Sequence, residues 1–524
     1  MMLLDLIVLL FGGGILAWIS GRMDARFPRW VSLIVLLVGL LYLITHWVGA
    51  DPDLADRALS GIPSGSGVWQ FALVADWMPL FGVKFFLAAD GLSLALLVLT
   101  FGLGIVAVFS AWSEITDRSG FFYFNLLWTL AGVAGIFSAL DLLLFFFFWE
   151  VMLIPMYFLI SLWGHEKREY AALKFFIFTQ VSGLLMLLSI IALAFFHYQQ
   201  TGVITFDYFS LRNTPLPEGV GIWVMLGFFV AFTVKLPSVP FHTWLPDAHT
   251  QAPTAGSVLL AGLLLKTGAY GLMRFILPLF PSQAAQFAPI AMLLGVISIL
   301  YAAKLAFAQL DFKRLIAYTS ISHMGFILLG IFSANALAMQ GAVIQMLAHG
   351  ISSSALFAIA GSLQHRLHTR QFSRMGGLAK TMPNTAAMGV FFSIAALGMP
   401  GFGNFVGEAL VLFGSFQVNP LLTMLATVGM ILSPIYALKI IQKVFHANAE
   451  AEPIGDALGE QARAEDFRFH ERLSMGLMVV AILWLGVHPQ PVIRLVEPSI
   501  SALLVPAPVQ VSGLAQQDEW SIGR

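Results

Sequence analysis

The stretch Phe145-Phe146-Phe147-Phe148-Trp149-Glu150-Val151-Met152 is continuously apolar except for one carboxylate. Its four phenylalanines do not alternate with polar residues, whereas the strands of a membrane β-barrel alternate over segments of about ten residues. The stretch belongs to an apolar segment, residues 141–162, and about 20 such residues cross roughly 30 Å of hydrocarbon as a helix. It therefore predicts a membrane-spanning helix with an ionisable group inside it.

Similar apolar segments fill much of the chain. The 524 residues are 59% hydrophobic and only 10% charged, with a mean hydropathy of +0.86. Soluble domains carry about 25% charged residues, so this chain has too few to cover a water-exposed surface. We expect an all-α integral membrane protein with about 14 transmembrane helices, at residues 2–20, 30–49, 90–111, 121–139, 141–162, 170–197, 222–247, 254–276, 286–308, 312–333, 336–363, 384–415, 418–445 and 471–490. Longer links are expected at about 50–85 and 447–470.

The absence of cysteine and of a nucleotide-binding loop motif excludes several kinds of cofactor site. The chain has no cysteine, which excludes disulfides, thiolate-bound iron–sulfur clusters and cysteine zinc sites. No G-x-x-x-x-G-K-[ST] loop for a nucleotide is present. A net charge of −1 gives no indication of nucleic-acid binding. We therefore expect no cofactor in this chain and no nucleic-acid partner.

The positive charges predict the orientation. Basic residues gather in the links after the first, fifth, ninth, eleventh and thirteenth expected spans, and none lies in the links after the fourth, tenth and twelfth. Positively charged links face the cytoplasm. Both termini are then expected on the outer, periplasmic side, which requires an even number of spans. The residues concerned are Arg22, Arg26, Arg29, Lys167, Arg168, Lys313, Arg314, Arg366, Arg370, Arg374, Lys380, Arg463, Arg468 and Arg472.

Two spans are interrupted by proline near their middle. The seventh contains Pro237 and Pro240, and the twelfth reads Gly398-Met399-Pro400-Gly401. Proline removes a backbone donor and breaks a helix, and the freed carbonyls are tolerated in lipid only beside protein or a wet cavity. Broken helices at corresponding places indicate two internal repeats with ion sites at their interface.

Two ionisable residues stand close to the expected midplane in the first half of the chain. If a helix begins near Asp141, nine residues at 1.5 Å each place Glu150 about 13.5 Å deep. Lys235 lies just before the break of the seventh span. Burial disfavours the charged form of lysine and a nearby carboxylate favours it, so such a pair can exchange protons. The alternatives are a carboxylate that only ties helices together and a lysine that extends its ammonium to water.

Four more residues repeat this pattern in later spans. Lys266 lies in the eighth span and Glu408 follows the break of the twelfth, while His323 and His349 fall within the tenth and eleventh. Ionisable residues inside spans usually mark an ion path, and imidazole titrates near neutral pH. The alternatives are snorkelling for the lysine, helix capping for the glutamate and structural hydrogen bonding for each histidine.

The remaining charged residues favour ordinary roles. Asp90 is expected to cap the third helix, and Lys174 and Lys304 to extend from span ends to water, although either could stand where protons enter. His242 and His249 have helix-like spacing but no third ligand for a metal.

Several long motifs resemble the antiporter-like subunits of respiratory complex I, the NADH:quinone oxidoreductase. The resemblance covers most of residues 85–446, and the sequence ends match more loosely. The segments that carry it are Lys235-Leu-Pro-Ser-Val-Pro-Phe-His-Thr-Trp-Leu-Pro-Asp-Ala-His-Thr-Gln-Ala-Pro-Thr-Ala-Gly-Ser257, residues 264–274, residues 311–325 and Gly398-Met-Pro-Gly-Phe-Gly-Asn-Phe-Val-Gly-Glu408. One branch of this family typically has glutamate where Glu408 stands, whereas its L and N branches usually have lysine.

The resemblance implies a fold, a set of roles and partners. It implies two inverted five-helix repeats at 121–276 and 286–446, between N-terminal spans at 1–111 and a C-terminal part at 447–524. Glu150 and Lys235 would form a coupled pair, Lys266 a central bridge, His323 and His349 a relay, and Glu408 a terminal site. Partners would be other complex I membrane subunits, especially L and N, with membrane lipid around them in a bacterial inner membrane. NADH, FMN, iron–sulfur clusters and quinone would belong to partner subunits.

The sequence thus favours a subunit that translocates protons, driven by redox chemistry elsewhere. Subunits of multisubunit Na⁺/H⁺ antiporters and of membrane-bound hydrogenases share these motifs and remain alternatives. A structural membrane subunit that conducts no ions is an alternative of a different class.

Overall fold

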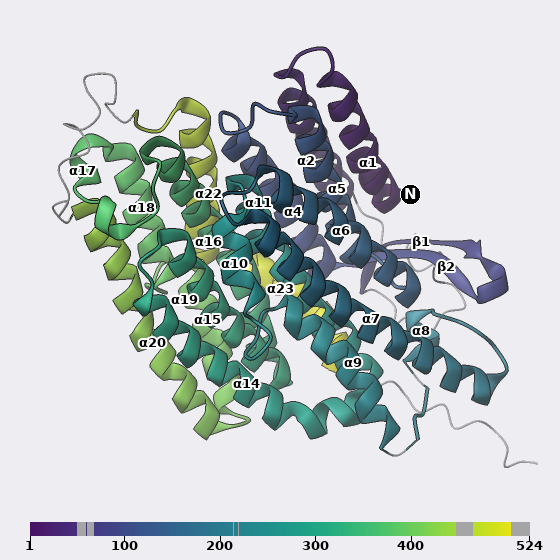
Figure 1. Cartoon of the computed structure of the whole chain (residues 1–524). Helices are drawn as coiled ribbons and strands as arrows, with labels where there is room; N and C mark the ends of the chain where they lie inside the picture. The colour runs from purple at the N-terminus through teal and green to yellow at the C-terminus, as the bar shows by residue number, and fades with distance from the viewer. Residues whose placement is uncertain (50–58, 60–67, 213, 218, 447–464, 505–524) are drawn as a thin grey trace, which may run out of the picture.

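The computed structural model describes residues 1–49, 59, 68–212, 214–217, 219–446 and 465–504. Within these ranges the chain is a bundle of long helices with one β-hairpin at its edge (Figure 1). Most of the predicted link at 447–470 lies outside the described residues.

Twelve helical segments of the described chain are long and apolar enough to cross a membrane. They are α1 (Met2–Ser20), α2 (Phe27–Val48), α4 (Gly91–Ala111), α5 (Ser119–Ile136), α6 (Leu142–Trp163), α7 (Arg168–Thr201), the continuous segment Thr254–Leu279, α14 (Pro281–Ala308), α15 (Phe312–Phe332), α16 (Ala336–Leu367), the segment Pro420–His446 that begins with α20 (Pro420–Ile440) and ends with η5 (Ile441–His446), and α22 (Phe469–Val487). The all-helical membrane fold is thereby confirmed, while the count of fourteen spans and the inverted repeats stay predictions.

The predicted seventh and twelfth spans each consist of two shorter helices. In the first, α9 (Val220–Lys235) ends at the candidate lysine and α10 (Trp244–Gln251) follows. In the second, α18 (Pro383–Ala396) precedes α19 (Gly403–Phe416). The remaining short helices are α8 (Tyr208–Leu211), α17 (Leu378–Thr381), α23 (Gln490–Leu504), η1 (Pro79–Phe81) and η4 (Phe372–Arg374).

The segment Thr254–Leu279 is not a uniform α-helix. It runs through α11 (Thr254–Leu259), a π-helical turn η2 (Leu260–Leu264), α12 (Leu265–Gly271), a second π-helical turn η3 (Leu272–Ile276) and α13 (Leu277–Leu279). π-Helical turns inside α-helices are rare and frequently occur at functional sites.

Short polar side chains fix where several helices begin. Asp90 accepts a hydrogen bond from the backbone N–H of Ser93, as the expected cap of α4. Asp141 caps α6 and Asp311 caps α15 in the same way. Such caps satisfy backbone donors that have no partner inside the helix. The cap at Asp141 also fixes the depth of Glu150, which lies nine residues further on.

A β-hairpin occupies the end of the segment expected as a link at 50–85. Strand β1 (Trp69–Met78) pairs antiparallel with β2 (Val83–Asp90), and Leu73 faces Leu87 in the register. Gly82 supplies a positive φ of 67° at the turn, a conformation that glycine adopts without strain. Apolar and polar residues do not alternate clearly along β2. The sequence alone therefore suggests the start of the next membrane span and not a strand. The hairpin lies at the right edge of the bundle in Figure 1.

The helices differ in how deeply they lie in the bundle. The apolar windows of Thr254–Leu279 and Ala336–Leu367 are completely buried. By contrast, α2, α20 and α22 expose many large apolar side chains, among them Leu41, Ile431 and Val480. An exposed apolar surface of this kind is compatible with lipid or a membrane partner. The candidate residues on α12 and α16 therefore lie at the centre, away from lipid.

The links divide between two sides of the bundle. Arg29 donates to the carbonyl of Trp112, Trp163 donates to the carbonyl of Asp117, and Lys313 lies 3.3 Å from His165. These contacts join the links after the first, third, fifth and ninth predicted spans on one side, here named the basic side. On the other, the hairpin side, Ala88 and Ser138 are joined by a backbone hydrogen bond.

Candidate functional site

Lys266 is completely buried at the start of α12, and a helix irregularity provides one of its partners. The backbone N–H of Leu265 donates five residues back to Leu260, the π-helical pattern, instead of to Ala261. The Nζ atom of Lys266 donates to the carbonyl of Ala261 at 2.6 Å. The same Nζ lies 2.8 Å from Nδ1 of His349 on α16. The π-helical turn therefore helps to hold the ammonium beside an imidazole.

His349 leads on to His323, which contacts Glu408. The ring centres of the two histidines lie 5.5 Å apart. Nδ1 of His323 on α15 is 2.8 Å from Oε1 of Glu408 on α19, and both side chains are almost completely buried. Gln345 donates from Nε2 to the same carboxylate oxygen at 3.2 Å and lies 3.3 Å from His323 Nδ1. Three helices thus bring an imidazole, an amide and a carboxylate together.

The second oxygen of Glu408 faces the break between α18 and α19. A Cβ atom placed on Gly398 would lie 3.0 Å from Oε2 of Glu408. Gly398 has a φ of 78°, which favours glycine, and the following Met399 is about half exposed. Glu408, the last residue of the series from Lys266, therefore lies beside a segment that is partly exposed at the surface of the chain.

Glu150 and Lys235 form a separate pair. Nζ of Lys235 lies 5.1 Å from the ring centre of Trp149 and 5.4 Å from that of Phe175. Lys235 and Glu150 interact electrostatically, but they form no hydrogen bond or ion pair, and Nζ has no hydrogen-bond partner in the described chain. Gly183 on α7 leaves room for the carboxylate, since a Cβ there would lie 2.9 Å from Oε1 of Glu150.

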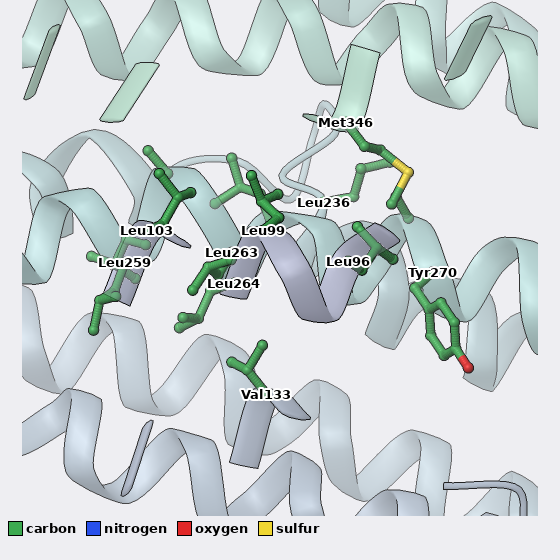
Figure 2. Close-up of a cluster of buried hydrophobic side chains, with 14 of the residues drawn as sticks. Leu96, Leu99, Leu103, Val133, Leu236, Leu259, Leu263, Leu264, Tyr270 and Met346 are labelled. Atoms are coloured by element: carbon green, nitrogen blue, oxygen red, sulfur yellow. The ribbon is translucent and has the colours of Figure 1, made fainter. Parts of the chain in front are cut away.

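The two groups of residues are adjacent but not connected. Gly268 of α12 packs directly on the end of α9, where a Cβ would lie 2.7 Å from the backbone nitrogen of Leu236. Figure 2 shows Leu236, Leu263 and Leu264 among the apolar side chains of this region. Within the described residues no hydrogen bond links Lys235 to Lys266.

Five of the six predicted site residues are buried and Glu150 is partly buried. Gln345, His249 and Lys313 are buried as well, and sequence reasoning assigned none of them to the site. Gln345 stands four residues before His349 on α16, a spacing that puts both on one face of the helix and could have indicated it. His249 is completely buried and stacks on Phe357 with ring centres 4.3 Å apart. Lys313 is buried although it lies in a basic link, because α15 begins at Phe312 and turns it inward.

A polar cavity of about 390 Å³ opens on the basic side. Its lining includes Glu114, Asp117, His165 and His365. His165 is partly buried and contacts Lys313. Burial, with the charges of Lys313 and Arg370, lowers the pKa of His165 to about 3. This histidine is therefore neutral at physiological pH.

No metal centre is present among the described residues, where no three His, Cys, Asp or Glu side chains come together in a way that could hold an ion. His242 and His249 in particular acquire no third ligand there.

A bundle of membrane helices with a buried series of lysine, histidine and glutamate side chains defines an integral membrane subunit that holds ionisable groups in its core. Residues 139–433, more than half of the chain, match the family described as NADH:quinone oxidoreductase/Mrp antiporter, transmembrane. The chain belongs to the antiporter-like membrane subunits of this family, within the branch of the M subunits of NADH-quinone oxidoreductase. The branch expected from the glutamate at position 408 is thereby confirmed.

Individual relatives agree with this assignment. The chain is 51% identical over 498 residues to NADH-quinone oxidoreductase subunit M of Escherichia coli K12, which covers 94% of this chain and 96% of that one. It is 51% identical over 497 residues to the same subunit of Pseudomonas aeruginosa, covering 93% and 94%. A chain of respiratory complex I from Thermus thermophilus superposes with a TM-score of 0.83 at 30% identity, over 96% of this chain and 99% of that one. The Mrp complex from Dietzia sp. shares the fold, with a TM-score of 0.79 at 23% identity over 96% of this chain and 52% of that one.

Proposed function

We propose that this chain translocates protons across the bacterial inner membrane through Glu150, Lys235, Lys266, His349, His323 and Glu408, driven by redox chemistry in partner subunits. The observation that carries the proposal is the buried series from Lys266 to Glu408. Its members lie at hydrogen-bond distance, apart from the two histidine rings, and all can gain or lose a proton.

The central residues can pass a proton by exchanging donor and acceptor roles. A charged Lys266 donates to Nδ1 of His349, and transfer of that proton leaves a neutral amine that still donates to Ala261. The Nε2 atoms of His349 and His323 have no protein partner in the described chain. One water molecule could bridge the two rings, whose centres lie 5.5 Å apart. His323 and Glu408 share the next proton across 2.8 Å. The direction of transfer then depends on the charge of neighbouring groups.

Glu150 and Lys235 are proposed as a pair whose separation controls the charge of Lys235. Their mutual attraction without a hydrogen bond means that a small shift of either side chain changes the stability of the lysine charge. A change of charge at Lys235 would in turn favour or disfavour the ammonium of Lys266 across the apolar gap. This electrostatic coupling requires no hydrogen bond between the two lysines.

The wider arrangement follows from the same proposal. The L and N antiporter-like subunits are the proposed neighbours in the membrane, with NADH, FMN, iron–sulfur clusters and quinone bound by other subunits of the assembly. The basic side would face the cytoplasm and both termini the periplasm. The two five-helix units at 121–276 and 286–446 would act as repeats around the central residues.

The test is NADH-driven proton uptake by inverted membrane vesicles that carry the Lys235→Ala variant. We expect assembly and NADH oxidation by the peripheral part to persist while proton uptake per NADH falls. Lys443→Ala is the matched control, because Lys443 lies exposed in η5 and has no proposed role. Normal uptake by an assembled Lys235→Ala complex would overturn the proposal and favour a subunit that conducts no ions. Uptake that depends on sodium would instead favour the antiporter alternative.

A further inference from the structure

A second buried charged group lies on the hairpin side of Lys266 and takes no part in the proposed series. Nη2 of Arg274 is 2.6 Å from Oδ2 of Asp90, and the two side chains are 2% and 0% exposed. Oδ1 of Asp90 accepts from the backbone N–H of Ser93. The sequence motif that begins at Leu264 ends on this arginine, and neither charge has a role in the proton series.

Tyr270 and Arg274 lie on the same helical segment as the central lysine. Lys266, Tyr270 and Arg274 follow one another at intervals of four residues, so they share a face of the helix. The hydroxyl of Tyr270 donates to the carbonyl of Phe137 at 3.3 Å and accepts from Nε of Arg274 at 3.3 Å. Ser93 adds a second hydroxyl 3.3 Å from it. These contacts link Tyr270 to Arg274 and Ser93, one helical turn from Lys266 on its hairpin side.

The ion pair at the end of this face is held firmly. The guanidinium carbon of Arg274 lies 5.0 Å from the ring centre of Trp69 on β1 and 5.3 Å from that of Tyr270. The hydroxyl of Ser499 on α23 lies 3.4 Å from the backbone nitrogen of Leu92, beside Asp90. The hairpin, α4 and α23 therefore enclose the pair.

The chemistry of these two groups suits a barrier rather than a relay. A guanidinium does not lose its proton in proteins, so Arg274 cannot pass one on. Asp90 balances the charge of Arg274 at 2.6 Å, so the barrier comes from an arginine that has no transferable proton and not from a net positive charge. Replacing a buried ion pair with neutral residues of similar size often leaves stability unchanged or raises it. Stability alone therefore gives little reason for a charged pair here.

We propose that the Arg274–Asp90 ion pair closes the hairpin-side end of the polar face that begins at Lys266 and prevents protons from leaking past it. The inference rests on the proposed function, because it takes Lys266 as the proton-carrying group. It assigns the pair a role in proton selectivity that is separate from pumping.

The test measures passive leak without NADH, which separates it from the test of pumping. The intact complex is reconstituted in vesicles, a potassium diffusion potential is imposed, and an enclosed pH dye reports proton flux. The main variant is Arg274→Met with Asp90→Asn, which removes both charges and leaves no unpaired buried ion. Arg366→Met with Glu471→Gln removes a largely buried ion pair away from this helix and is the matched control.

We expect the neutral double variant to leak protons several-fold faster than wild type, with unchanged potassium permeability. Arg366→Met with Glu471→Gln should stay close to wild type, and adding Lys266→Met to the Arg274→Met, Asp90→Asn variant should abolish the extra leak. A double variant as tight as wild type, or one that leaks potassium equally, would overturn the proposal. A leak that survives Lys266→Met would also overturn it, because the protons would then bypass the central lysine.

Discussion

Replacing Gln345 by leucine tests whether the amide beside Glu408 controls a proton-carrying carboxylate. Leucine has a similar size, so the packing between α16 and α19 should change little. The substitution removes the hydrogen bond from Nε2 to Oε1 of Glu408 and leaves that from His323. The substitution therefore removes one of the two hydrogen-bond contacts of Glu408 Oε1.

The size of the effect follows from the geometry. Hydrogen bonds to charged groups contribute about 1.5–3 kcal/mol. The 3.2 Å distance between Gln345 Nε2 and Glu408 Oε1 lies at the long end of the usual range, which favours the lower figure. A loss of about 1.5 kcal/mol corresponds to roughly tenfold in a rate. If Glu408 must release a proton in every cycle, proton uptake should fall by up to about tenfold.

The assay is proton uptake per NADH oxidised in inverted vesicles, with assembly checked by native electrophoresis. Gln340→Leu is the matched control, since Gln340 is partly buried on the same helix but makes none of these contacts. Uptake equal to wild type in an assembled Gln345→Leu complex would refute the reasoning. An equal loss in the control would show that the effect comes from packing of α16.

Three further predictions concern other parts of the chain. Gly183→Ala should displace the flexible end of Glu150, because the new Cβ would lie 2.9 Å from its Oε1, and lower proton uptake in vesicles while thermal stability is kept. His349→Ala should reduce uptake strongly, and His349→Gln less, because Lys266 loses its 2.8 Å partner. Asp466→Asn at pH 7 should destabilise the start of α18 by about 0.5 kcal/mol in thermal unfolding, the low end of the range for losing a helix cap, because asparagine keeps one acceptor oxygen.

The last of these also has a pH dependence with a definite sign. Partial burial opposes the charge of Asp466, but hydrogen bonds from Thr385, Asn384 and Phe467 lower its pKa to about 2. The unfolded value is about 3.9, so the stabilisation is present above about pH 4 and disappears as the pH falls toward 2. Asp466→Asn should remove this pH dependence, whereas Glu465→Gln, an exposed neighbour, should not.

The predictions for Gly183→Ala and His349→Ala have their own controls and contrary outcomes. Gly102→Ala on α4 meets nothing within 4 Å, so it should leave uptake unchanged and separate the effect at Glu150 from a general effect of alanine. Unchanged uptake in Gly183→Ala, or a loss of assembly instead of uptake in His349→Ala, would contradict the reasoning.

Most of the fold could be predicted because it depends on the local chemistry of the chain. A helix in hydrocarbon must satisfy its own backbone, so each long apolar segment specifies a span. Proline 237 and the glycines at 398 and 401 likewise marked the places where α9 and α18 end. The hairpin at 69–90 was missed because its pairing depends on contacts between two strands whose residues do not alternate, and α23 because its amphipathic face packs on α4 and α16.

The sequence by itself predicted the burial of Lys235, Lys266 and Glu408, since they stand within apolar segments that lipid or protein must surround. Only the tertiary structure decided which of them meet. Contact between Lys266 and His349 depends on how α12 packs on α16, and Gln345 and the Arg274–Asp90 pair acquire their partners across helices far apart in the chain. Burial follows from the composition of one segment, whereas a hydrogen bond between helices requires the relative placement of two.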